Sequence, residues 1–88
     1  MKKFSLKAEE MKTRENADSH LKMVFGITDS NQLTLDSIYM EIMSLKGQVT
    51  IVLDDASEVV ENLGRFGLGL IKLFRDAASE SDNIDFQW

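Results

Sequence analysis

The chain contains no cysteine and no proline. The first absence excludes disulfide bonds and thiolate metal sites, and the second removes the commonest helix breaker from all 88 residues. No apolar run approaches the roughly 18 residues needed to span a bilayer, and no signal peptide is expected at the start. We therefore expect a single cytoplasmic domain, with a core small enough that partner subunits would help to stabilise it.

Charge is unevenly distributed over the chain, whose net charge is −5. Residues 1–22 hold six Lys or Arg and four Asp or Glu, whereas residues 23–88 hold four and eleven. An acidic body repels phosphate backbones, so we do not expect a nucleic-acid polymer as partner. The basic end is suited to an acidic protein, a second copy or a small anion; the alternative is an ordinary solvated surface. The candidate partner or anion contacts are Lys3, Lys7, Lys12, Arg14 and Lys22.

Apolar residues recur in steps of three and four from Leu35 to Ala77 without interruption. This heptad spacing predicts a helical coiled coil or bundle, with one long amphipathic helix over about residues 31–79. Four of the six e positions are also large and apolar: Tyr39, Leu53, Val60 and Phe74. A stripe this wide favours a bundle, in which each helix contacts two neighbours, over a two-stranded coiled coil.

The length of this helix favours self-association. At 1.5 Å per residue it would extend about 70 Å, whereas a compact globule of this size is about 30 Å across. The rest of the chain is too short to cover it, so we expect a homo-oligomer, with three or more chains favoured. The predicted oligomer core consists of Leu35, Ile38, Ile42, Leu45, Val49, Val52, Ala56, Val59, Leu63, Phe66, Leu70 and Leu73.

The two ends of the chain flank this helix. A shorter basic helix is expected over about residues 4–26, ending at Gly26 as its C-cap, and Asp29 or Ser30 is the expected N-cap of the long helix. Residues 80–88 form an acidic aromatic tail. Its alternating apolar residues are either held against the protein's own surface or form a docking motif for a partner. These residues are Ile84, Phe86 and Trp88.

Two segments leave alternatives open. Residues 48–53 are rich in β-branched side chains and follow Gly47, as a strand would. The helix is preferred here because no partner strand is evident. The cluster Gly64, Gly67 and Gly69 indicates either a bend or the close approach of a neighbouring backbone. Close approach is preferred because the heptad register runs through the cluster.

No catalytic or metal-binding constellation is evident, so we expect neither an enzyme nor a cofactor. His20 is the only histidine and has no partners at ligand spacing, so an exposed structural role is expected. Asp54, Asp55, Glu58 and Glu61 form an acidic cluster typical of a solvated helix face.

The sequence therefore predicts an all-α, non-enzymatic protein–protein interaction module: an assembly factor, scaffold, chaperone or inhibitory binder acting as a homo-oligomeric bundle. One alternative is a membrane-surface protein using the amphipathic segment 63–77, where apolar residues alternate with Arg65, Lys72 and Arg75. This alternative is disfavoured because the same residues continue the heptad stripe. A further alternative is a ligand-sequestering oligomer with anion pockets between its subunits, lined by the basic N-terminal residues.

Overall fold

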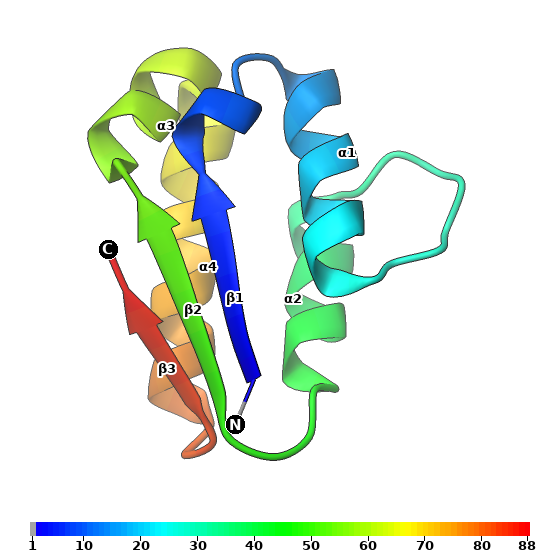
Figure 1. Ribbon diagram of the computed structural model, residues 1–88, viewed down its shortest axis with the longest axis vertical. Helices are drawn as coiled ribbons and strands as arrows, with labels where there is room; N and C mark the ends of the chain where they lie inside the picture. Colours follow the sequence, from blue (N-terminus) through cyan, green and yellow to red (C-terminus); the bar gives the residue numbers. More distant parts are fainter. Residues whose placement is uncertain (1) are drawn as a thin grey trace.

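The computed structural model describes residues 2–88 and shows an α/β protein (Figure 1). The prediction of an all-α coiled coil or helical bundle is therefore wrong. Three strands and four α-helices are present in the described residues, with one short 3-10 helix, η1. In chain order the elements are β1 (Lys2–Lys7), η1 (Ala8–Glu10), α1 (Arg14–Phe25), α2 (Leu35–Met43), β2 (Val49–Asp54), α3 (Ala56–Leu63), α4 (Arg65–Glu80) and β3 (Ile84–Gln87).

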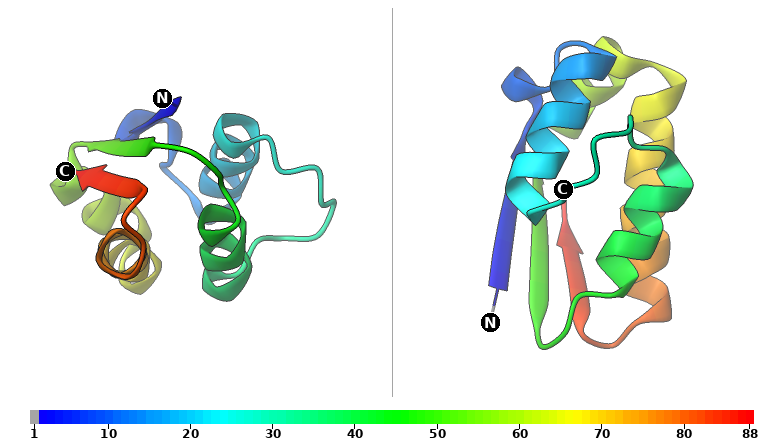
Figure 2. Two further views of the ribbon diagram at one scale, coloured as in Figure 1. Left: turned by 90° about the horizontal axis from the view of Figure 1, so that it is seen from below. Right: turned by 90° about the vertical axis from the view of Figure 1, so that its right-hand side faces the viewer.

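The three strands form one parallel sheet in the order β1-β2-β3. Phe4 of β1 pairs with Ile51 of β2, which pairs in turn with Phe86 of β3. Parallel neighbours require crossover connections, and such connections are almost always right-handed. Because both crossovers have the same hand and the strands follow in order, all the helices lie on one side of the sheet (Figure 2).

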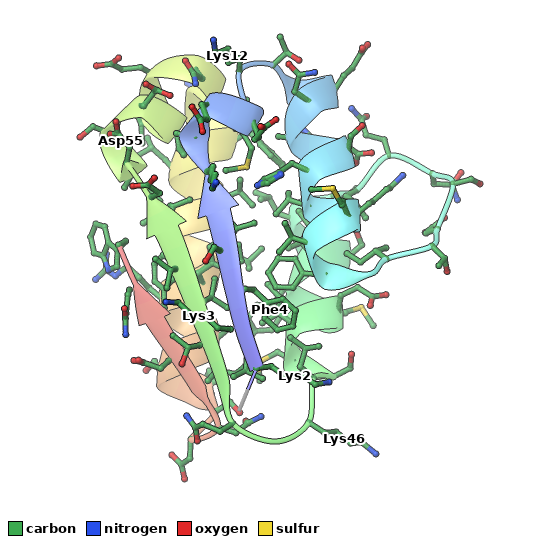
Figure 3. The ribbon with its side chains drawn as sticks, in the orientation of Figure 1. Lys2, Lys3, Phe4, Lys12, Lys46 and Asp55 are labelled. Atoms are coloured by element: carbon green, nitrogen blue, oxygen red, sulfur yellow. The ribbon has the colours of Figure 1, made fainter. Side chains whose placement is uncertain are left out.

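The two faces of the sheet differ in polarity. On the face toward the helices, Leu6, Val49, Ile51, Leu53 and Ile84 are buried in the core. The opposite face is open and carries mostly polar side chains, and Figure 3 shows Lys3 projecting from it while Phe4 points toward the helices. This alternation is that of a half-exposed sheet. The residues of the open face are Lys3, Ser5, Lys7, Thr50, Val52, Asp54, Asp85 and Gln87.

Short polar side chains set the helix ends. Thr13 caps α1, its hydroxyl accepting a hydrogen bond from the Asn16 amide at 3.1 Å. Gly26 ends α1 in the left-handed region at φ 68°, which confirms the predicted C-cap. The next N-cap is Thr34, which forms a capping box with Ser37. The predicted cap at Asp29 or Ser30 is wrong, because residues 27–34 form an extended loop.

The long helix over residues 31–79 does not exist. Its span contains α2, β2, α3 and α4, and the chain changes direction at Gly64, whose φ of 58° and ψ of −126° end α3. The helix expected over residues 4–26 is likewise wrong in its first part, which forms β1 and η1. The tail over residues 80–88 contains β3, which pairs with β2.

The residues of the predicted oligomer core lie on four different elements of one chain. Six are buried in the protein's own core: Ile38, Ile42, Val49, Val59, Leu70 and Leu73. The other six are half-buried: Leu35, Leu45, Val52, Ala56, Leu63 and Phe66. No continuous stripe is therefore presented to other copies, and the described chain has no long uncovered helix that would require them. Self-association itself stays a prediction, which light scattering would test.

Candidate functional site

Helix α4 has one face in the core and another that lines an open groove. Leu70, Phe74 and Ala77 have no exposed surface and anchor the inner face. Leu68, at 57% exposed, lies on another face of the helix together with Arg75. In the predicted heptad, Leu68 falls at position f and Ile71 at position b, both outside the stripe. These two positions were the signal in the sequence that this face of the helix carries apolar side chains among its charges.

Helix α3 forms the second wall of the groove through Ala56, Ser57 and Val60. It begins directly after β2, where Asp55 adopts a left-handed conformation at φ 59° and its side chain caps the helix by accepting from the Glu58 amide at 3.2 Å. Figure 3 shows Asp55 at the carboxyl end of β2. The reversal of the chain at Gly64 then places α4 against α3. Sequence reasoning missed this juxtaposition because it joined the two helices into one.

Trp88 closes the groove at the carboxyl end of β3. Its ring stacks on Phe86, with centroids 6.1 Å apart and planes inclined by 8°, and Phe86 in turn lies 5.3 Å from Phe74 in the core. The Arg75 guanidinium carbon is 5.6 Å from the centroid of the Trp88 ring, within the range of a cation–π contact. Trp88 is thus held from two sides while remaining 64% exposed.

The resulting groove encloses about 570 Å³, a volume within the usual range for binding sites. Apolar side chains from both helices and Trp88 form most of its lining. Its charged residues are two cations, Lys72 and Arg75, and one carboxylate, Asp76. We refer below to this set as the α3–α4 groove. Its lining residues are Ala56, Ser57, Val60, Leu68, Ile71, Lys72, Arg75, Asp76 and Trp88.

The segment 63–77, predicted as an alternative membrane-surface helix, contributes to the core as well as to the groove. Leu70, Leu73 and Phe74, which the amphipathic pattern counts among its apolar face, are buried against the rest of the protein. Among residues 2–88 no helix combines the length and apolarity that crossing a membrane requires. Of the large apolar side chains in α4, Leu68 is the one that is mainly exposed.

The five predicted basic contacts do not converge on one site. Lys3 and Lys7 lie on the open face of the sheet, and Lys12 is exposed in the turn before α1. The guanidinium carbon of Arg14 lies 3.6 Å from the centroid of the Phe66 ring, and its side chain donates to the Leu33 carbonyl. These positions provide no shared anion pocket within the described chain.

The remaining basic contact, Lys22, belongs to a cluster that holds the 27–34 loop. Its ammonium lies 3.1 Å from the Asp18 carboxylate and donates to the Asn31 carbonyl at 2.7 Å. The Asp18 carboxylate also accepts a hydrogen bond from the Leu33 amide at 2.6 Å. Burial acts to raise the pKa of Asp18, but the Leu33 amide and Lys22 outweigh it and lower that pKa below its ordinary value. Lys22 and Asp18 thus have a structural role in the fold.

His20 is buried, at 8% exposed, contrary to the predicted exposed position. Its Nε2 accepts a hydrogen bond from the Lys7 amide at 3.2 Å and so links α1 to the end of β1. Desolvation lowers the pKa of His20; nearby Lys7 lowers it further, and Glu10 acts in the opposite direction. The short connection between η1 and α1 brings Lys7 and Glu10 close to His20. The spacing of potential metal ligands in the sequence gives no sign of this contact.

A pH dependence of stability follows from His20. Because its pKa is lowered in the folded state, the unfolded chain binds more protons as the pH falls through its unfolded value of about 6.5. We expect the free energy of unfolding to decrease between about pH 7 and pH 5, where the imidazole loses its acceptor role toward Lys7. Urea unfolding at each pH measures this effect. His20→Gln should flatten the curve in this window, and an unchanged slope would contradict the assignment.

The acidic cluster lies at the carboxyl end of the sheet and is divided among elements. Asp54 ends β2, Asp55 caps α3 and Glu58 lies in the first turn of α3. Across residues 2–88 the structure contains no group of three or more His, Asp or Glu arranged to hold a metal ion. The α3–α4 groove is therefore the candidate site that the geometry supports best.

Comparison with known proteins does not identify this chain: no protein-family model matches its sequence, and no curated protein matches it.

Proposed function

We propose that this protein is a non-enzymatic interaction module that binds another protein through the α3–α4 groove, in the cytoplasm. The observation that carries the proposal is the groove's exposed apolar lining. Leu68 and Trp88 are large side chains that expose more than half of their surface to water within one concave site. Large exposed apolar patches on small proteins mark interaction surfaces, and tryptophan is enriched among the residues that dominate binding energy.

Rigidity supports the same function. Trp88 is held by its stack on Phe86 and by Arg75, and Val60 and Ile71 belong to helices that pack directly on each other. A preformed site loses little conformational entropy on binding. The other exposed large apolar side chains, Met23 and Met40, lie on α1 and α2 and line no part of this groove.

The proposal is tested by a matched pair of substitutions. Leu68→Glu places a charge in the groove lining, whereas Met40→Glu places the same charge on α2, where the side chain is 71% exposed. Each tagged variant is used to capture proteins from an extract of the organism that encodes it, with quantitative mass spectrometry. We expect at least one protein to be captured by wild type and by Met40→Glu but reduced about tenfold or more with Leu68→Glu.

Both variants should keep wild-type circular dichroism, because both positions are exposed and glutamate is a good helix former. Capture that is equal for all three proteins would show that the groove is not the binding surface. Light scattering on the same samples distinguishes self-association. A mass near the 10.0 kDa of one chain would exclude a second copy as the partner.

A further inference from the structure

The groove wall on α4 has the residue spacing that one helix presents to another. Leu68, Ile71, Lys72 and Arg75 recur at i, i+3, i+4 and i+7, so they form one continuous face about two turns long. The facing wall is also helical. Apposed helices pack by inserting the side chains of one into the grooves formed by such rows, and an amphipathic helix in a groove is a common mode of peptide recognition.

The other side of α4 already packs against a helix. A Cβ placed on Gly69 would lie 2.6 Å from Cδ1 of Leu35, so α2 approaches α4 closely there. Leu68 and Arg75 lie on the side of α4 that lines the α3–α4 groove and are exposed. Figure 2 shows α2 and α4 side by side in the helix layer. A partner helix in the groove would extend this layer past α4.

The charges of the groove select among partner helices. Lys72 and Arg75 line it, and within residues 2–88 neither side chain has an ion pair or a hydrogen-bond acceptor, although Arg75 contacts the Trp88 ring. Asp76 is the one carboxylate in the lining, so Lys72 and Arg75 make the net charge of the groove positive, whereas the chain as a whole carries a net charge of −5. Carboxylates of a bound partner would pair with them, while a basic partner would be repelled.

We propose that the α3–α4 groove binds an acidic amphipathic α-helix of a partner protein. The apolar stripe of that helix contacts Val60, Leu68, Ile71 and Trp88, and carboxylates beside the stripe pair with Lys72 and Arg75. This inference rests on the proposed function, because it assigns the chemistry of the partner to the same groove.

Synthetic peptides test the partner chemistry directly. The probe is a helical peptide of about 18 residues, since shorter ones are poorly helical, with leucines at i, i+3, i+4 and i+7 flanked by glutamates. The two comparison peptides carry lysines in place of the glutamates, or scramble the acidic sequence. None contains tryptophan, so emission from Trp88, the only tryptophan of the protein, reports occupancy of the groove. We expect the acidic helix to shift Trp88 emission to shorter wavelength and to bind about tenfold more tightly than either comparison peptide.

Charge reversal gives a second, independent readout. In the double variant Lys72→Glu with Arg75→Glu the preference should invert, so that the lysine peptide binds more tightly than the glutamate peptide. Both positions are exposed, so the fold should be retained. The control is Lys46→Glu, an exposed lysine in the loop between α2 and β2, which should leave the preference unchanged (Figure 3).

Three outcomes would overturn the inference: equal binding of the acidic and basic helices, equal binding of the scrambled peptide, or binding without a change in Trp88 emission. Its failure is distinguishable from failure of the proposed function. If the acidic helix does not bind but Leu68→Glu still abolishes capture of a partner, the groove is an interaction site with a different partner chemistry.

Discussion

Replacing Ile51 by asparagine is expected to lower the free energy of unfolding by about 3–5 kcal/mol. Ile51 has no exposed surface and is the central residue of the sheet, between Phe4 and Phe86 on the face toward the helices. The substitution removes buried apolar area and leaves a polar amide among hydrocarbon side chains, where hydrogen-bond partners are lacking. Because small domains are stable by only about 5–15 kcal/mol, Ile51→Asn should unfold at far lower urea concentration than wild type.

The neighbouring position provides the control. Val52 points to the open face and is half-buried, so Val52→Asn should cost less than about 1 kcal/mol. The predicted heptad makes the opposite assignment, because it places Val52 in the stripe and Ile51 outside it. Urea denaturation of the two variants, followed by circular dichroism, therefore separates the strand from the helix at this segment. Equal stabilities would contradict the sheet register.

The failure of the long-helix prediction has a specific physical cause. Strand β2 carries apolar side chains on both faces, with Val49 toward the helices and Val52 toward the open face. Val49 and Val52 are three residues apart, so although they lie on opposite faces of the strand, both match the heptad spacing and the pattern appears to continue. The β-branched composition of residues 48–53 was the correct signal for a strand. No partner strand is evident from the sequence because parallel pairing joins strands that are far apart in the chain.

The partner strands themselves had weak signals. In β1 the apolar positions Phe4 and Leu6 alternate with lysines and a serine, and in the C-terminal segment Ile84 and Phe86 alternate with polar residues. Both are edge strands, and the lysines of β1 discourage further strand pairing at its edge. Period-2 alternation over so few residues is a weak signal for a strand. The end of α1 at Gly26 was predictable because its signal is local.

The candidate site was predictable only in pieces. The sequence marks Trp88 as part of an alternating aromatic tail and marks residues 63–77 as amphipathic. What joins them is tertiary structure, since β3 must pair beside β2 for Trp88 to reach α4. The second wall of the groove depends on the reversal of the chain at Gly64. The spacing of apolar residues continues unchanged across this turn, so the heptad pattern does not reveal it.

Replacing Gly67 by alanine is expected to destabilise the protein by about 2 kcal/mol, lowering the melting temperature by roughly 8–16 °C. A Cβ at this position would lie 2.7 Å from the Val59 carbonyl oxygen and 3.1 Å from Cα of Val60. Both are backbone atoms of α3, so no side-chain rotation relieves the overlap, and α3 must move away from α4. The gain of about 1 kcal/mol in helix propensity offsets only part of this cost. Since α3 and α4 form the walls of the groove, the same movement should weaken binding there.

Gly69→Ala is the matched control on the same helix, because it adds the same methyl group and the same helix propensity. Its new Cβ would meet Cδ1 of Leu35 at 2.6 Å, but this is the end of a half-buried side chain that can rotate. We expect a free energy of unfolding within about 0.5 kcal/mol of wild type. Rotation of Leu35 relieves most of the overlap, and the gain in helix propensity offsets the remaining cost. Thermal unfolding of both variants measures the difference. If Gly67→Ala melts at or above the temperature of Gly69→Ala, then α3 does not pack on α4 at this point, and the groove would lose the contact that fixes its width.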